Sequence, residues 1–329
     1  MKDKQSMKID DKMLLVNQKI EEFLLTDDSF MNEIMKWQLR SKGKQLRPRL
    51  MLMSASFGSW KDRLIEFAAA LEILHMASLV HDDIVDDAQQ RRGKDSVQYR
   101  FGRNAAVYAG DYMVFCVLSK FSYLPSRQQC EVYRSLSNLC KGELMQYENL
   151  YNVHLTEEKY IQQIQGKTAT LFQIACSIGS IESGCKDSVV ESLAEFGKNF
   201  GIMFQLQDDL LDCVGAKNMG KRTESDIGLG VYTLPLVHAL NDPIARPQLK
   251  VLLEEYRNKQ QDDVYHKIQN WVIKAGGVEY TIERLKNFRE WAIRAIEPLP
   301  NIEEKTMLIN LSDAICNNAV YIAEQSVAI

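Results

Sequence analysis

The sequence has few residues that interrupt helices: of its 329 residues, 7 are proline and 17 are glycine. It also lacks a convincing alternating strand pattern and an Asn-Gly hairpin signal. These absences argue against a β-rich fold. Apolar periodicity of about 3.6 residues runs along nearly the whole chain, and this pattern predicts an all-α protein.

Paired cysteines are also lacking. The seven cysteines are scattered, odd in number and contain no Cys-x-x-Cys spacing; they lie at positions 116, 130, 140, 176, 185, 213 and 316. This distribution argues against a disulfide framework and against a zinc site. It is typical of reduced thiols in a cytoplasmic protein.

Positive charge is not in excess, and long apolar runs are missing. The net charge is −4 and no basic patch is interleaved with aromatic residues, so we expect no nucleic-acid partner. The polar residues 1–11 lack the apolar core of a signal peptide. No run reaches the ~18 apolar residues of a membrane span, so we expect no transmembrane segment.

The helical pattern divides the chain into a series of amphipathic segments. We expect helices over residues 14–25, 30–40, 45–57, 61–87, 97–101, 104–121, 127–151, 156–179, 189–214, 233–240, 248–258, 261–275, 278–296 and 302–326. The polar, Gly-rich stretch 215–230 is expected to be a loop. Because no linker is long enough to separate domains, we expect one all-α domain over residues 1–329, a large helical bundle around a central apolar cavity.

An acidic motif ends the long apolar helix expected at 61–87. Four carboxylates lie within the six residues from Asp82 to Asp87. Asp82 and Asp86 are four residues apart, so a helix projects them from one face, where like charges repel. Hard oxygen ligands on a rigid face suit Mg²⁺ that is shared with substrate phosphates. The alternative is a solvated acidic helix end, but the spacing recurs in Asp208-Asp209-x-x-Asp212, which favours the metal site.

Each acidic motif continues into a stripe along its helix. One stripe comprises Asp86, Asp82, Ser78, His75 and Leu71, and the other Asp212, Asp208, Gln205, Gly201 and Gly197. Two such stripes facing each other would form a cavity with an acidic mouth and a largely apolar body. Such a cavity suits a molecule with a phosphate head and a hydrocarbon tail.

Basic residues stand where the phosphates of such a molecule would need them. Lys44 and Arg47 lie on a turn that enters a helix, where free amides attract anions. Arg91-Arg92-Gly93 follows the first acidic motif, and arginine can bind phosphate through two parallel hydrogen bonds. The alternatives are ordinary surface charge for the first pair and ion pairs with Asp86 and Asp87 for the second.

Together these residues resemble a known family, the trans-type polyprenyl diphosphate synthases. The matching motifs are Gly43–Pro48, His75, His81–Asp86, Arg91–Gly93, Gly110-Asp111, Gly142-Glu143-x-x-Gln146, Lys167-Thr168, Phe204-Gln205-x-x-Asp208-Asp209-x-x-Asp212, Gly220-Lys221 and Thr233-Leu234-Pro235. The resemblance implies an isoprenoid synthase fold. It also implies condensation of isopentenyl diphosphate with an allylic diphosphate, farnesyl or geranylgeranyl, in a medium- or long-chain enzyme that supplies quinone side chains.

The resemblance also implies residue roles. Asp82, Asp86 and Asp208 would hold Mg²⁺, as three ions with bound diphosphate, and Arg91, Lys167 and Lys221 would steady the allylic diphosphate. Lys44, Arg47, His75 and Arg92 would bind isopentenyl diphosphate, and Thr168 and Gln205 would lie near the allylic cation. One position departs from the family pattern, because Val231 stands where a diphosphate-binding lysine is common.

Two small residues before the first motif bear on product length. Ala77 and Ser78 precede Asp82 by five and four residues, and an aromatic side chain there would block the cavity. Ser78 lies about 6 Å before Asp82 along a helix. We therefore expect a product of C30–C40, hexaprenyl to octaprenyl.

Three other hypotheses stay open. One is a shorter-chain geranylgeranyl diphosphate synthase, and a second is a class I terpene cyclase, which should lack the basic motifs that would bind isopentenyl diphosphate. The third is a non-catalytic or regulatory subunit, which Val231 favours and the intact aspartates disfavour. The resemblance further implies a homodimer or a heterodimer with a small second subunit, for which the apolar helix at 104–121 could provide a contact face.

Overall fold

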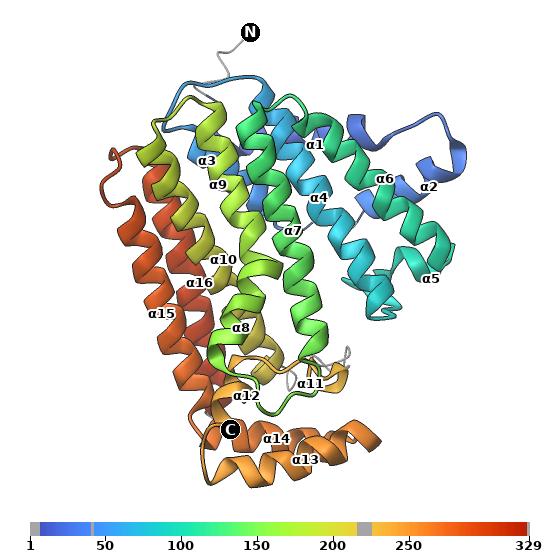
Figure 1. The fold of residues 1–329 in the computed structure, drawn as a ribbon, viewed down its shortest axis with the longest axis vertical. Coiled ribbons are helices and arrows are strands. Elements are labelled where there is room, and N and C mark those ends of the chain that lie inside the picture. Colours follow the sequence, from blue (N-terminus) through green and yellow to red (C-terminus); the bar gives the residue numbers. More distant parts are fainter. Residues whose placement is uncertain (1–6, 41–42, 216–225, 328–329) are drawn as a thin grey trace. The chain divides into compact units, whose positions relative to one another are not determined.

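The computed structural model describes residues 7–40, 43–215 and 226–327, and these form helices almost throughout (Figure 1). The α-helices are α1 (Ile9–Leu24), α2 (Ser29–Leu39), α3 (Leu46–Ala55), α4 (Arg63–Val85), α5 (Val97–Phe101), α6 (Arg103–Phe121), α7 (Ser126–Glu148), α8 (Glu157–Ile164), α9 (Thr170–Glu182), α10 (Asp187–Gly215), α11 (Asp226–Leu229), α12 (Leu234–Ala239), α13 (Ala245–Lys259), α14 (Asp262–Lys274), α15 (Gly277–Ile296) and α16 (Glu303–Val327). A short π-helical segment, η2 (Gln165–Ala169), joins α8 to α9. The predicted all-α fold is confirmed.

One small hairpin was not predicted. Strand β1 (Gln90–Arg91) pairs antiparallel with β2 (Lys94–Asp95), and Arg91 lies opposite Lys94. The two residues between the strands, Arg92 and Gly93, have φ of 53° and 74°. Positive φ at both central positions is the geometry of a type I′ turn. Sequence patterns miss it because each strand has only two residues and arginine is not a usual first residue of this turn.

The chain forms two compact units. Unit 1 comprises residues 1–134, 171–194 and 299–305, and unit 2 comprises residues 135–170, 195–298 and 306–329. Each unit is described separately below. The prediction of a single domain over residues 1–329 stays a prediction.

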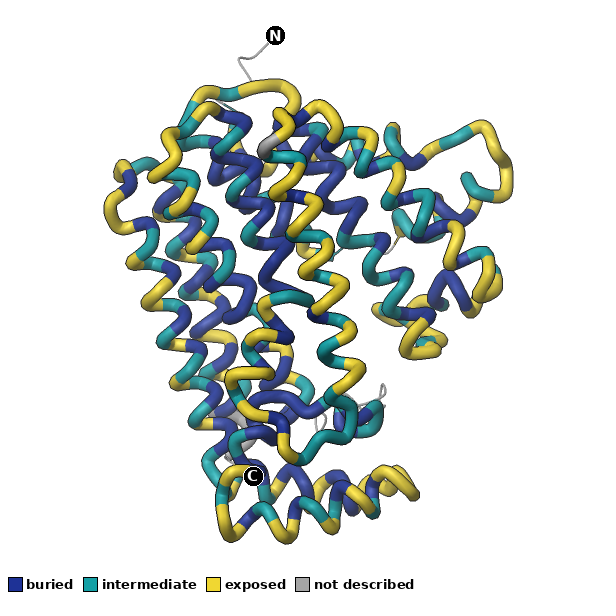
Figure 2. Tube along the Cα trace, viewed as in Figure 1, coloured by how far each residue is buried: buried dark blue, intermediate teal, exposed yellow. Residues whose placement is uncertain are grey.

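In unit 1, α4 forms much of the core and packs against α6 (Figure 1). Figure 2 colours most of its first half as buried, and Phe67, Leu71 and Ile73 are at most 2% exposed. Among the described residues α4 is the one helix long and apolar enough to pass a length-and-composition test for a membrane span, and 67% of its apolar window is buried in the structure. Core helices of soluble proteins pass the same test, so its hydropathy is explained by burial within unit 1.

In unit 2, the part of α10 from Glu195 onward supplies much of the core through Phe196, Phe200 and Leu206, each fully buried. The rings of Phe196 and Phe200 stack with their centroids 5.9 Å apart. Helix α15 begins against α12, where a Cβ on Gly277 would lie 2.3 Å from the carbonyl oxygen of Pro235. Only glycine permits this close approach of the two backbones.

Candidate active site

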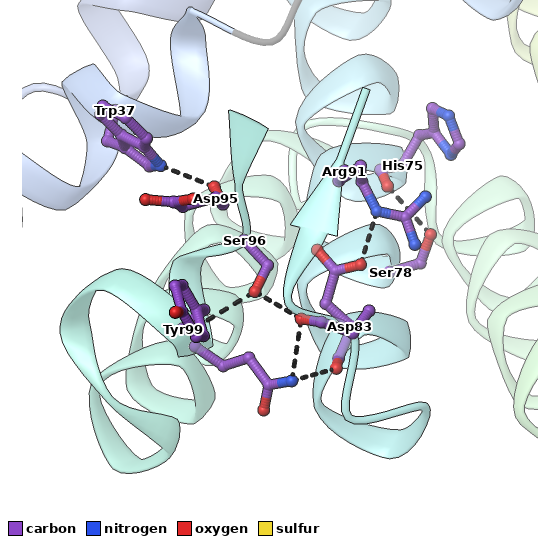
Figure 3. Close-up of polar contacts among 10 residues, drawn as sticks. Trp37, His75, Ser78, Asp83, Arg91, Asp95, Ser96 and Tyr99 are labelled. Carbon is purple, nitrogen blue, oxygen red and sulfur yellow. Dashed lines mark hydrogen bonds and ion pairs between the residues drawn. The ribbon is translucent and has the colours of Figure 1, made fainter. Parts of the chain in front are cut away.

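The first acidic motif lies at the carboxyl end of α4. The backbone N–H of Asp86 donates to the carbonyl oxygen of Asp82 at 2.8 Å, so the two residues are one helical turn apart as predicted. Asp82 is partly exposed and Asp86 is exposed. Asp83 differs, because it is 4% exposed and its Oδ1 accepts a hydrogen bond from Nε of Arg91 at 2.6 Å (Figure 3). Burial raises the pKa of Asp83, and the Arg91 charge opposes that shift.

The hairpin that carries Arg91 is tied to the end of α4. Gln98 Nε2 donates to the carbonyl oxygens of Asp83, at 2.6 Å, and Ala88, at 3.1 Å. Ser96 Oγ donates to the same Ala88 oxygen at 2.6 Å and accepts from the N–H of Tyr99, so it also caps α5 (Figure 3). These bonds fix the position of the arginines relative to the aspartates.

A basic cluster forms where the turn before α3 meets the hairpin. Arg47 is 9% exposed and its guanidinium lies 4.4 Å from the centroid of the Phe172 ring. Arg92 lies against Gly43, where a Cβ would stand 2.7 Å from Arg92 Nη1. Gly43 therefore provides the space that the Arg92 guanidinium occupies. Lys44, beside it, is exposed.

Two ionisable residues of α4 lie in the field of these arginines. Burial lowers the pKa of His75 well below its ordinary value, and the charges of Arg47, Arg92 and Arg91 lower it further. His75 is therefore neutral at neutral pH. Glu72 is 5% exposed; burial raises its pKa, and Arg47 and Arg92 oppose that shift.

The sequence did not lead us to predict that Glu72 lies beside the basic cluster. The available signal was a single carboxylate inside the apolar run of α4, three residues before His75.

Of the two residues expected to control chain length, Ala77 is fully buried and Ser78 is half-buried. Ser78 Oγ donates to the carbonyl oxygen of His75 at 2.9 Å (Figure 3).

The second acidic motif lies on α10 in unit 2 and repeats the division seen in the first. Asp208 is exposed and Asp212 is half-buried, whereas Asp209 is 2% exposed. The Tyr160 hydroxyl donates to Asp209 Oδ2, and Gln205 Nε2 donates to Oδ1 at 2.9 Å. Burial raises the pKa of Asp209 to about 8. In both motifs the second aspartate is thus bonded inside the protein, while the first and last reach solvent.

The acidic group of unit 2 includes a residue that was not predicted. Asp226, the first residue of α11, lies close enough to raise the pKa of Asp212, which burial and this charge together bring to about 7. Asp226 follows the Gly-rich stretch after the second motif, and its distance from Asp212 in sequence hid the contact.

Lys167 and Thr168 lie on the π-helical segment η2. Thr168 Oγ1 donates to Gln205 Oε1 at 2.7 Å, which extends the hydrogen-bonded chain from Tyr160 through Asp209 and Gln205. Lys167 Nζ pairs with Glu143 Oε2 on α7 at 3.0 Å. Segments of this kind occur often at functional sites.

A glycine of α7 permits the close approach of η2. A Cβ on Gly142 would stand 2.4 Å from the backbone nitrogen of Lys167. The Gly142-Glu143 motif therefore has two structural functions, close packing and the ion pair of Glu143. Lys221 lies outside the described residues.

The predicted residues gather within each unit. Unit 1 brings Arg91 to the acidic motif and groups Arg47, His75 and Arg92. Unit 2 joins Thr168 to Gln205 by a hydrogen bond, while Lys167 pairs with Glu143. Among the described residues no group of three or more His, Cys, Asp or Glu side chains forms a preformed metal cage. Paired hard-oxygen ligands such as Asp82 and Asp86 instead fit a divalent ion whose remaining ligands are phosphate and water oxygens.

Comparison with known proteins supplies an independent observation. The polyprenyl synthetase sequence model matches residues 28–271. Heptaprenyl diphosphate synthase component 2 of Bacillus subtilis is 29% identical over 310 residues, which cover 93% of this chain and 88% of that protein. Octaprenyl diphosphate synthase of Escherichia coli is 31% identical over 302 residues, covering 90% and 93%.

Other similar proteins include an enzyme named for a different product and a solved structure with a bound ligand. Geranylgeranyl diphosphate synthase of Saccharolobus solfataricus is 31% identical over 301 residues, which cover 88% of this chain and 90% of that protein. The crystal structure of polyprenyl synthase from Caulobacter crescentus, complexed with calcium and isoprenyl diphosphate, has a TM-score of 0.86 at 28% identity, covering 93% of this chain and 94% of that one.

Proposed function

The chain belongs to the polyprenyl synthetase family, and from this premise we propose that it condenses isopentenyl diphosphate with farnesyl or geranylgeranyl diphosphate. It is a polyprenyl diphosphate synthase, an enzyme that transfers prenyl groups. The observation that carries the proposal is the shared design of the two acidic motifs, in which Asp83 and Asp209 are buried and bonded while Asp82, Asp86 and Asp208 reach solvent.

We assign the basic residues and His75 to the diphosphate groups of two different substrates. Lys44, Arg47 and Arg92 would bind the diphosphate of the isopentenyl substrate, and neutral His75 would donate one hydrogen bond without adding charge. Arg91 and Lys167 would steady the allylic diphosphate, with Lys221 as a further cation. Cations fixed at the leaving group stabilise the charge that develops there.

Metal binding is assigned to Asp82, Asp86 and Asp208, with three Mg²⁺ ions proposed for the complex with diphosphate. When bound, such ions neutralise the diphosphate as it leaves. Solved relatives contain calcium with isoprenyl diphosphate, which supports a divalent ion in this family. Thr168 and Gln205, joined by a hydrogen bond, would face the allylic cation.

The proposed product is a C30–C40 all-trans chain for quinone side chains. The similarity to heptaprenyl and octaprenyl diphosphate synthases supports this range, and small residues at Ala77 and Ser78 are consistent with it. The similarity to a geranylgeranyl diphosphate synthase keeps a C20 product as the alternative.

We further propose a cytoplasmic dimer. Helix α6 presents Tyr108 and Phe115 with 68% and 67% of their surface exposed, seven residues apart on one face. The partner is a second copy or a small dissimilar subunit; the Bacillus subtilis relative is named as component 2 of its enzyme.

The test is an assay of the purified protein with Mg²⁺, farnesyl diphosphate and radiolabelled isopentenyl diphosphate, followed by product sizing. We expect C30–C40 products from the wild type and none from Asp82→Ala. Consumption of the allylic substrate without isopentenyl diphosphate would indicate a terpene cyclase instead. A wild type with no activity to lose, alone or with a partner subunit, would indicate a non-catalytic subunit.

A further inference from the structure

The turn before α3 is held by a side chain of α1 that no motif includes. Gln45 Nε2 donates to Asn17 Oδ1 at 2.9 Å, and Asn17 Nδ2 lies 3.4 Å from Gln45 Oε1, so the two amides form a reciprocal pair. Asn17 is held in turn by a hydrogen bond to the carbonyl oxygen of Met13 at 3.0 Å. All these residues are in unit 1, and both amides are half-buried.

Gln45 occupies an unusual backbone position. Its φ of 50° and ψ of 44° place it in the left-handed region as the residue that precedes α3. Residues other than glycine adopt this conformation only when their surroundings enforce it. Its side chain forms no cap hydrogen bond to α3 and is directed to Asn17 instead.

This strained residue stands between the two cations that the turn presents. Lys44 precedes Gln45 and Arg47 follows two residues later, so the direction of the chain at Gln45 determines how both approach a diphosphate. Gly43, on the same turn, accommodates the Arg92 guanidinium. A rotation of the turn would therefore disturb three of the four residues proposed to bind isopentenyl diphosphate.

A second contact joins the same helices without involving the turn. Arg49 Nη1 pairs with Asp10 Oδ1 at 2.7 Å, and 81% of the Asp10 side chain is exposed. Asp10 lies two turns before Asn17 on α1, and Arg49 one turn after Gln45, so both pairs join the same helix faces. This ion pair provides a control for general loosening of α1 from α3.

We infer that Asn17 is a positioning residue for the isopentenyl diphosphate subsite, acting through Gln45. The inference rests on the proposed function. Asn17 touches no substrate; it holds Gln45 in the left-handed conformation, and that conformation sets Lys44 and Arg47 in place.

The test compares Asn17→Ala with Asp10→Asn in the full-length protein. We expect Asn17→Ala to raise KM for isopentenyl diphosphate about fivefold or more, as for loss of one hydrogen bond. KM for the allylic substrate should stay within about twofold, and Asp10→Asn should leave both values unchanged. Calorimetric titration with isopentenyl diphosphate should show the same loss of affinity without relying on turnover.

Exchanging the two side chains tests whether the contact between the amides matters, rather than either residue alone. Asn17→Gln and Gln45→Asn should each weaken isopentenyl diphosphate binding, because the summed length of the two side chains changes. The double variant restores that length and should recover most of the affinity. Recovery would also show that loss in the single variants does not come from misfolding.

Two results would overturn the inference. One is an Asn17→Ala variant that lowers Tm but leaves KM for isopentenyl diphosphate at the wild-type value. The other is a Gln45→Ala variant that binds isopentenyl diphosphate normally, because alanine lacks the amide but still resists the left-handed conformation. A wild type that neither binds nor consumes isopentenyl diphosphate would refute the proposed function itself, which is a different outcome.

Discussion

Arg91 Nε lies 2.6 Å from Oδ1 of Asp83, and this contact distinguishes Asp83 from Asp82 and Asp86, which are not buried. Only 5% of the Asp83 side chain is exposed, whereas 31% of the Arg91 side chain is exposed. The pair therefore joins a buried carboxylate to a cation that reaches the surface of the site.

Substitution of Asp83 should act on stability. Asp83→Asn removes the charge that holds Arg91, and we expect a loss of about 2–4 kcal/mol in the free energy of unfolding, because one partner of a largely buried pair is removed. Urea denaturation measures this loss. A variant as stable as the wild type would show that the pair is not needed for the fold.

Asp86 is the matched comparison within the same motif. It is exposed, so Asp86→Asn should change the free energy of unfolding by no more than about 0.5 kcal/mol. Turnover should fall about a hundredfold, because Asp86 would be a ligand of the Mg²⁺ that neutralises the departing diphosphate, and an amide holds that ion more weakly. The Mg²⁺ concentration for half-maximal activity should rise in parallel. Unchanged kinetics in this variant would contradict the role assigned to Asp86.

In unit 2, Tyr160→Phe tests the chain of hydrogen bonds that ends at Thr168. The substitution removes one donor from the buried Asp209 carboxyl, so we expect a loss of about 1–3 kcal/mol in stability and a lower kcat. Tyr265→Phe is the control, because that hydroxyl donates to the Asp212 backbone carbonyl at 3.1 Å. Equal kcat values in the two variants would show that the Tyr160 bond is purely structural.

The sequence was sufficient to predict the helical architecture and the spacing of Asp82 and Asp86 by one helical turn. Periodicity places Asp82 and Asp86 on one face, and the backbone bond between them confirms it. It could not distinguish Asp82 from Asp83, because the two side chains are chemically identical and only the tight turn at Arg92-Gly93 returns Arg91 to one of them.

Contacts between segments that are distant in the sequence could not be predicted either. Gln45 has no sequence signal for a left-handed conformation, and its partner Asn17 lies on another helix. The π-helical segment at Lys167 lies in close contact with Gly142 of α7, and periodicity within one segment does not predict such a contact. Tertiary packing, not local propensity, determines these features.

His75 should make stability depend on pH. Its pKa in the folded protein lies well below 6.5, so below about pH 6.5 the unfolded chain binds a proton that the folded protein does not. The stability contribution is therefore complete above pH 6.5 and is lost as the pH falls. The slope should reach at most about 1.4 kcal/mol per pH unit.

His75→Asn is the reference for that measurement, since an amide does not titrate. Urea denaturation between pH 5 and pH 7.5 should show a smaller loss of stability on acidification in the variant than in the wild type. Parallel curves for the two proteins would contradict a lowered pKa for His75 in the folded protein.

Product length should respond differently at Ser78 and Ala77. Ser78 is half-buried about 6 Å before Asp82 on α4, so Ser78→Phe places a ring on the stripe of the proposed cavity and should shorten the product. Ala77 is fully buried, so Ala77→Phe must displace packed neighbours and should cost about 1–3 kcal/mol in stability.

Ser78→Ala is the matched control, because it removes the hydrogen bond to the His75 carbonyl without adding volume. It should leave the product distribution unchanged, which would attribute the effect of Ser78→Phe to the bulk of the ring. Sizing of radiolabelled products measures both variants. If Ser78→Phe makes the same C30–C40 products as the wild type, the growing chain does not pass this position of α4, and the face that includes Leu74 and the adjoining helix α6 becomes the place to look for the limit on length.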